Sequence, residues 1–146
     1  MEIKGSHSLT QSPEAIWSQL NDPSVLARIT PGLSRLENIE GDKFTAISEI
    51  KIGPVKARFE GELEMTNKVD GQSMVVEVRQ TSKIGNVNAA ISMSLDPENG
   101  ETVINYAGEA KIVGKLATMG NRMVGSVVSK LSKQFFVNLE NEFKNQ

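Results

Sequence analysis

The clearest pattern in the chain is a row of apolar residues, spaced three and four apart, near its C-terminal end. The row runs from Leu116 through Met123 and Phe135 to Phe143, and no proline interrupts it. Spacings of this kind place side chains on one face of an α-helix. The pattern therefore predicts one amphipathic helix over residues 115–145, about 45 Å long at the usual rise per residue.

The two halves of this predicted helix differ in side-chain size. The first half carries Gly120 and Gly125 among its methionines, whereas the second carries Phe135 and Phe143. Phenylalanine fills a core, while glycine beside flexible methionine leaves room and adapts to shape. We interpret the second half as core and the first half as the wall of a cavity. Close helix packing at the glycines is the alternative interpretation.

A different period governs the rest of the chain. Apolar and polar residues alternate over residues 2–9 and again over residues 34–112, where Gly, Pro, Asp and Asn clusters interrupt them. Period two with such turn signals predicts a first strand and then a six-stranded antiparallel meander. Between them, Ser12-Pro13 and Asp22-Pro23 each precede a short apolar-faced helix. The sheet has one apolar face to cover, and only the C-terminal helix is large enough.

Composition limits the classes of function. The chain has 146 residues, a length typical of one domain, and we treat residues 1–146 as a single domain. The absence of cysteine excludes a disulfide framework and a cysteine metal site. A net charge of −2 does not suggest nucleic-acid binding. We found no signal-peptide or bilayer-spanning run, so a cytoplasmic protein is the expectation.

Three segments carry a resemblance to a known family. They are Ser12-Pro13-Glu14 through Trp17 to Asn21-Asp22-Pro23 and Pro31-Gly32; Val55-Lys56-Ala57-Arg58-Phe59 with Gly61; and Gly108-Glu109-Ala110 through Gly114 and Met119-Gly120 to Arg122-Met123-Val124. Together they resemble the carbon monoxide dehydrogenase G-subunit family. The order of elements resembles the START-like (SRPBCC) helix-grip superfamily. This implies an α+β fold in which a seven-stranded antiparallel sheet wraps around a long C-terminal helix, with two short helices after the first strand.

The resemblance also implies a function. It suggests a non-catalytic protein that binds and delivers a lipophilic small molecule, a quinone or a lipid. The implied partner is a molybdenum-containing carbon monoxide dehydrogenase-type enzyme, which the family is associated with recruiting to the membrane. A peripheral position at the inner face of the membrane would follow. Many relatives carry a longer C-terminal tail proposed as a tether, and the end of this sequence at Gln146 argues against that tether here.

Two other functions stay open. The superfamily includes enzymes, so a cyclase or hydrolase acting on a hydrophobic substrate in the same cavity is the main alternative. A purely structural docking protein with a collapsed core is the other. The inner face offers few polar side chains, namely His7, Ser48, Gln80 and Tyr106. Because these form no recognisable catalytic or metal-binding set, we predict no catalytic residue, no metal and no cofactor.

The turns of a meander alternate between its two ends, and the two ends differ here. One end has acidic turns, whereas the other has Lys51-Ile52 and Lys83-Ile84 at its turn tips. We interpret this second end as an apolar, weakly basic rim that admits a ligand or touches a membrane or partner. Inward packing of the two isoleucines as strand ends is the alternative. The predicted ligand-binding residues are Ile29, Pro31, Ile52, Phe59, Ile84, Ile91, Met93, Tyr106, Met119 and Met123.

Overall fold

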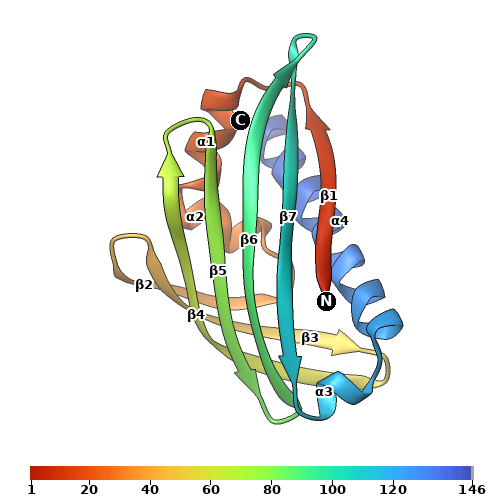
Figure 1. Cartoon of the computed structure of the whole chain (residues 1–146). Coiled ribbons are helices and arrows are strands. Elements are labelled where there is room, and N and C mark those ends of the chain that lie inside the picture. Colours follow the sequence, from red (N-terminus) through yellow and green to blue (C-terminus); the bar gives the residue numbers. More distant parts are fainter. Residues whose placement is uncertain (146) are drawn as a thin grey trace.

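The computed structural model describes residues 1–145, which form one long sheet and four helices (Figure 1). In chain order the elements are β1 (Glu2–Leu9), α1 (Pro13–Leu20), α2 (Pro23–Ile29), β2 (Leu33–Glu40), β3 (Lys43–Ile52), β4 (Val55–Val69), β5 (Ser73–Ser82), β6 (Gly85–Glu98), β7 (Glu101–Val113), α3 (Lys115–Thr118) and α4 (Asn121–Lys144). The predicted first strand, the two short helices and the six-stranded meander are all confirmed.

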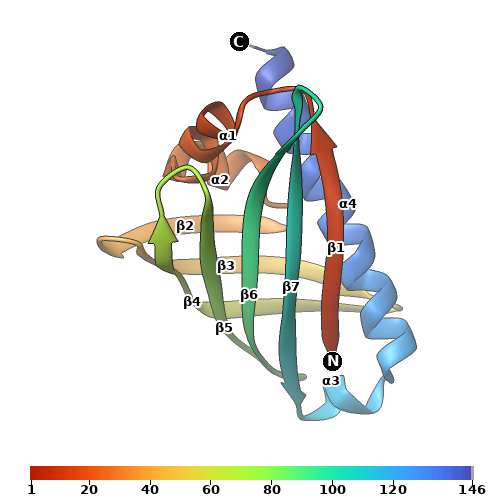
Figure 2. The same cartoon turned by 45° about the horizontal axis from the view of Figure 1, so that its top comes forward.

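All seven strands belong to one antiparallel sheet. Its strand order is β1-β7-β6-β5-β4-β3-β2, so that β1 returns to pair with the last strand of the meander. The sheet curves so strongly that β2, β3 and β4 run across the direction of β1, β6 and β7 (Figure 2). The helices α1, α2 and α4 cover its inner, concave face (Figures 1 and 2).

The two short helices begin where the sequence signals predicted. The Ser12 side chain accepts a hydrogen bond from the backbone N–H of Ala15, at 3.2 Å, at the start of α1. Asp22 accepts one from the backbone N–H of Ser24, at 2.9 Å, at the start of α2. These bonds satisfy N–H groups that have no partner inside a helix. The Ser24 hydroxyl also donates to Asp22, at 2.7 Å, and this bond, followed by the one from the Ser24 N–H, lowers the pKa of the Asp22 carboxyl group.

The prediction of one continuous C-terminal helix is wrong in its first part. The chain forms a single short turn of helix, α3, and then breaks at Met119 and Gly120 before α4 begins at Asn121. Gly120 has a φ of 89°, a conformation that residues other than glycine rarely adopt. The helical spacing of apolar residues continues across the break, so periodicity alone did not reveal it. No helix within residues 1–145 is both long and apolar enough to cross a membrane.

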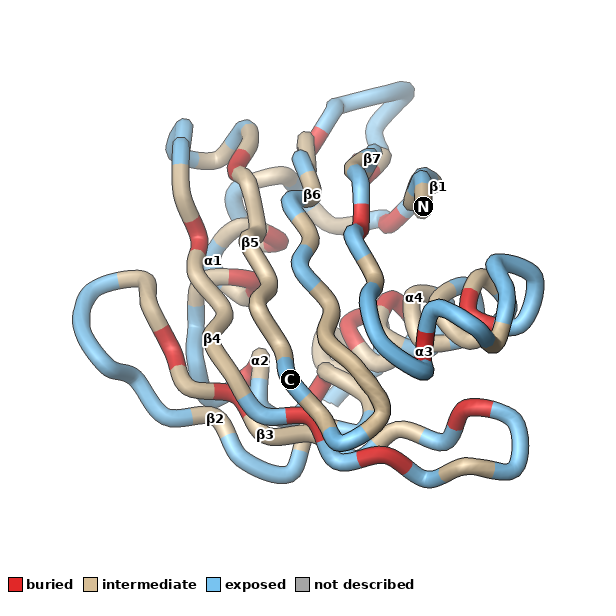
Figure 3. The backbone as a smooth tube through the Cα atoms, turned by 60° about the horizontal axis from the view of Figure 1, so that its bottom comes forward, coloured by how far each residue is buried: buried red, intermediate tan, exposed pale blue. Residues whose placement is uncertain are grey.

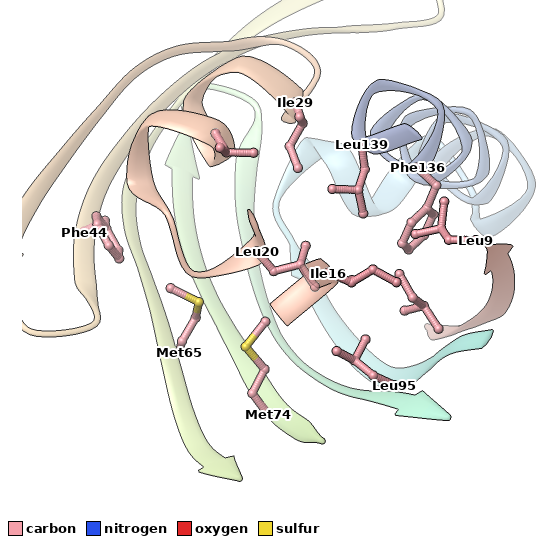
Figure 4. Close-up of a cluster of buried hydrophobic side chains, with 12 residues drawn as sticks. Leu9, Ile16, Leu20, Ile29, Phe44, Met65, Met74, Leu95, Phe136 and Leu139 are labelled. Atoms are coloured by element: carbon pink, nitrogen blue, oxygen red, sulfur yellow. The ribbon is translucent and has the colours of Figure 1, made fainter. Parts of the chain in front are cut away.

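The core divides into two clusters, one at each end of α4. The upper cluster joins α1, α2 and the second half of α4 to the sheet (Figure 4) and comprises Leu9, Ile16, Leu20, Val25, Ile29, Phe44, Met65, Met74, Leu95, Ile104, Phe136 and Leu139. The lower cluster joins α3 and the start of α4 to β3 and β4 and comprises Ile52, Ala57, Phe59, Leu116 and Val124. The second half of the helix is therefore core, as predicted.

The phenylalanine that anchors α4 is not one of those in the predicted apolar row. Phe136 is 4% exposed, whereas its neighbour Phe135 is only partly buried and meets the Phe136 ring edge-on. The rings of His7 and Tyr106 stack on Phe136 at centroid distances of 5.1 Å and 5.3 Å. Phe136 thus links the helix to β1 and β7 at once.

We therefore expect Phe136→Ala to lower the free energy of unfolding by about 3–5 kcal/mol, as large core truncations do. The matched control is Val137→Ala, at the next residue along α4, whose side chain is 43% exposed. That change should cost no more than about 0.5 kcal/mol. Urea denaturation of the two variants measures both values. A similar loss in both would mean that α4 is not anchored through Phe136.

Candidate functional site

The candidate site is a loosely packed zone between the two clusters, which we call the middle belt. It consists of Val78 on β5, Ala89 and Ile91 on β6, and Leu131 on α4. All four are only partly buried, and none belongs to either cluster. Apolar side chains in the interior of a domain are normally packed by many neighbours. The belt is therefore the part of the inner face whose apolar side chains keep some solvent exposure between the two clusters.

The sequence explains why the belt is loosely packed. Small residues occupy the inner face here: Ala89 pairs with Val78 and Ala110, and Ile91 pairs with Gly108. A side chain at Gly108 would collide with the backbone of Ala90, so this position holds glycine because two strands approach closely. Small side chains on the sheet leave α4 without partners to interlock with at mid-length.

The structure separates the ten predicted ligand-binding residues. Ile52, Phe59, Ile84 and Met119 gather in or against the lower cluster, whereas Ile29, Met93 and Tyr106 belong to or pack against the upper cluster. Ile91 lies in the middle belt. The half-buried Pro31 precedes Gly32, which lies against Ile50 of β3. The structure thus places the predicted residues above, below and within the belt.

Two details of the predicted rim change in the structure. Ile52 is 4% exposed and is the last residue of β3, so the alternative of a strand end packing inward holds for it. Met123 is 39% exposed and reaches Gly53 in the β3–β4 turn rather than the interior. The predicted row runs mostly at steps of four residues, each about 40° more than a full helical turn, so it drifts around α4 and places Met123 away from the face that buries Val124, Phe136 and Leu139. Val78, Ala89 and Leu131 were missed because nothing distinguishes them from ordinary core positions in the sequence.

Tyr106 supplies the inner face with a hydroxyl. Its ring lies across β1 at Gly5, where an added Cβ would come within 2.6 Å of Tyr106 Cζ. Among residues 1–145 no side chain or backbone group forms a hydrogen bond with this hydroxyl. A tyrosine hydroxyl in an apolar setting normally finds a partner, so the group is available to a ligand.

Gln80 supplies a second polar group on the inner face. Its side-chain nitrogen donates to the backbone carbonyls of Arg79, at 3.2 Å, and Glu62, at 3.5 Å. Both partners are acceptors, which fixes the nitrogen on that side of the amide. The amide oxygen is buried and has no hydrogen-bond partner in the described part of the chain. A ligand that donates a hydrogen bond would satisfy it.

His7, the chain's one histidine, is already engaged in a contact that joins the sheet to the helix. Its Nε2 lies 2.5 Å from Glu140 Oε1, and its ring stacks on Phe136. The fourth predicted inner polar residue, Ser48, pairs in register with Phe59 on the other side of the belt. The four polar side chains are therefore spread along the inner face. Within residues 1–145, no three His, Asp or Glu side chains come together as a metal site would require.

The outer face of the sheet carries two shallow hollows over β5, β6 and β7. One is lined largely by outward-facing residues such as Glu77, Arg79, Asn88 and Lys111, with Val78 and Ala89 of the belt also at its floor. The other is lined by Val75, Ser92 and Asn105 among others, together with Met93 and Tyr106. Arg79 donates a hydrogen bond to Glu62, at 3.1 Å, which lowers the pKa of that carboxyl group. Paired surface charges over small polar side chains do not resemble a site for an apolar ligand.

Comparison with known proteins agrees with this architecture. The family model for the carbon monoxide dehydrogenase G-subunit (CoxG) matches residues 5–144. No curated protein matches the sequence. A conserved protein from Geobacillus kaustophilus is 32% identical, and its crystal structure superposes with a TM-score of 0.94 over 99% of this chain and 96% of that one.

More distant structures show the same fold. A START superfamily protein from Mycobacterium smegmatis matches with a TM-score of 0.76 at 10% identity, over 99% of this chain and 97% of that one. The Zhui aromatase/cyclase from Streptomyces sp. R1128 matches with a TM-score of 0.68 at 13% identity, over 97% and 92%. The chain therefore has the START-like helix-grip fold that the order of its elements predicted.

The packing of Tyr106 over β1 gives a testable consequence. We expect Gly5→Ala to lower the free energy of unfolding by about 1–3 kcal/mol, because the new methyl group overlaps the tyrosine ring. In a Tyr106→Ala background the same change should cost little, since the ring is gone. A double-mutant cycle followed by urea denaturation measures the coupling. Equal costs in the two backgrounds would show that the ring does not lie there.

Proposed function

We propose that the chain, which belongs to the carbon monoxide dehydrogenase G-subunit (CoxG) family, binds and delivers a lipophilic small molecule. The ligand would lie in the middle belt, between Leu131 of α4 and the inner face of β5 and β6. The observation that carries this proposal is the partial burial of apolar side chains in the interior between two well-packed clusters.

Removal of apolar area from water would dominate the binding free energy. Apolar burial contributes roughly 25 cal/mol per Å², before the cost of immobilising the ligand is subtracted. Apolar side chains of the belt already lie on both sides of the proposed site, so a ligand that fills the space increases burial on the sheet and the helix together. The Tyr106 hydroxyl can donate to a carbonyl oxygen of a quinone or a lipid, whereas the unpaired amide oxygen of Gln80 can accept only from a ligand hydroxyl, as in a quinol or a lipid.

We favour a binding protein over an enzyme on the arrangement of the inner face. Catalysis of proton transfer needs an acid or base within hydrogen-bonding distance of the reacting group. The ionisable side chains His7 and Glu140 contact each other beside Phe136 in the upper cluster. A cyclase remains the second candidate because the Streptomyces neighbour is an aromatase/cyclase.

The family suggests the partner. Its description as a subunit of carbon monoxide dehydrogenase supports an accessory role beside that enzyme. We extend this proposal to a molybdenum-containing form of the enzyme and to a part in bringing it to the membrane. We expect the chain to co-purify with such an enzyme from its own cells, and mass spectrometry of a gentle affinity purification would show it. Recovery of the chain free of that enzyme, from cells that contain it, would contradict the accessory role.

The ligand site is tested by filling the belt from the sheet. Ala89 and Ala90 are neighbours on β6, but Ala89 faces inward and is partly buried, whereas Ala90 faces outward and is exposed. We expect Ala89→Phe to weaken binding of a short-chain quinone or a fluorescent fatty acid at least tenfold. Ala90→Phe should leave affinity unchanged. The measurement is a fluorescence titration of wild type and both variants.

Thermal unfolding of both variants provides the control for folding, because a bulky residue on a strand can disturb the sheet by itself. Equal affinities in the two folded variants would place the ligand outside the belt. Failure of the wild type to bind either probe would count against a lipophilic ligand in the middle belt. A larger residue at Gly120 would not test the site, because a side chain added there meets no neighbour within 4 Å and the positive φ of this position disfavours any residue other than glycine.

A further inference from the structure

Acidic residues are absent from three stretches of the sequence that meet at one end of the molecule. No Asp or Glu occurs between Glu49 and Glu60, between Glu77 and Asp96, or between Glu109 and Glu140. These stretches contain the β3–β4 turn, the β5–β6 turn and the whole segment from the end of β7 through α3 into α4. The overall charge of −2 is therefore distributed unevenly along the chain.

The fold brings these three stretches together. The backbone N–H of Leu116 in α3 donates to the carbonyl of Ile84 in the β5–β6 turn, at 2.6 Å. The β3–β4 turn meets α4 where Gly53 lies against Met123. All three stretches also contribute to the lower cluster. Figure 3 views the molecule from this end, with exposed backbone at the turn tips around α3.

Five cations surround this end, and we call them the basic rim: Lys51, Lys83, Lys111, Lys115 and Arg122. Each is exposed, and among residues 1–145 none of them forms an ion pair. Most other basic residues of the strands do form such pairs, including Lys43, Lys56, Arg58 and Arg79. The rim therefore presents positive charge that nothing in the described chain neutralises.

Apolar side chains lie among these cations. Val113 and Met123 are each 39% exposed, and Pro54 at the tip of the β3–β4 turn is exposed as well. Cations around a small apolar centre suit the surface of a bilayer, where headgroups meet the lysines and apolar side chains reach the acyl boundary. Opposite charge also steers the encounter over about a Debye length of 8–10 Å.

The chemistry of the rim favours lipid over protein. Protein interfaces are depleted in lysine and depend on buried aromatic and arginine side chains. The rim has four lysines and one arginine, and the three segments that carry it at this end expose no aromatic residue. Clusters of four to eight basic residues near a membrane are typical of binding to anionic phospholipids.

We infer that the basic rim docks the protein on an anionic phospholipid surface, with Val113 and Met123 at the point of contact. The inference deepens the proposed function, since it places the lower end of the ligand-binding interior at the bilayer, where a lipophilic ligand resides. Docking itself needs no ligand. Vesicle binding by ligand-free protein therefore tests the basic rim separately from ligand binding in the middle belt.

The experiment is co-sedimentation of the full chain with vesicles of phosphatidylcholine alone or mixed with phosphatidylglycerol. We expect binding to the anionic vesicles only, weakening as salt is raised. The variant Lys83→Glu/Lys115→Glu should lower that affinity about tenfold or more. The matched control Lys133→Glu/Lys144→Glu makes the same change in net charge at exposed positions of α4 away from the rim, and its affinity should stay within about twofold.

Other outcomes decide against the inference. Equal losses in the rim variant and its control would show that net charge alone governs binding, and no binding by the wild type would also overturn it. If the rim variant instead keeps vesicle binding but loses co-purification with the enzyme, the rim is a protein interface. Ala89→Phe should bind vesicles like the wild type. Loss of ligand binding in the middle belt can therefore be told apart from loss of vesicle binding by the basic rim. Thermal unfolding of each variant confirms that it is folded.

Discussion

The structure depends on one constraint: a strongly curved seven-stranded sheet has a single long helix to cover its apolar face. A straight helix over a curved sheet meets it well only at particular points. Here α4 contacts α2, β1 and β3. Its second half reaches α2 through Asn138 and Glu142 and β1 through Glu140, whereas Val124 near its start shares the lower cluster with Ile52 of β3. The upper and lower clusters are these two regions of contact. The middle belt is the consequence, because between its anchors the helix spans a surface that curves away.

Glycine and alanine on the strands make this curvature possible. A side chain at Gly61 would collide with the Arg79 backbone, and one at Gly108 with the Ala90 backbone. Both positions are on the inner face, where the strands approach most closely. The same small side chains that let the sheet curl also place less apolar volume on its inner face at mid-height. The curvature of the sheet and the location of the candidate site therefore have the same cause, namely the small residues on the strands.

The sequence predicted the fold well because each element has a local cause. The alternation of apolar and polar residues predicts every strand. The side chains of Ser12 and Asp22 begin the short helices by accepting hydrogen bonds from backbone N–H groups two or three residues further along the chain. The helix break at Gly120 has no such signal, because glycine also occurs at Gly125 within α4 without interrupting it. Which glycine adopts a positive φ depends on how α3 and α4 each pack on the sheet. The position of Met123 and the choice of Phe136 over Phe135 depend on the same packing.

The candidate site could be predicted only in its chemistry. An apolar interior with few polar groups follows from alternation, which places Gln80 and Tyr106 inward. Its location between the clusters does not follow, because Ala89 and Leu131 have the same sequence signature as filled core. A partly exposed interior also has a thermodynamic consequence. Apolar area left in contact with water contributes nothing to folding until a ligand covers it. Any molecule that occupies the belt therefore stabilises the folded chain by mass action, and occupancy and stability are linked through the same side chains.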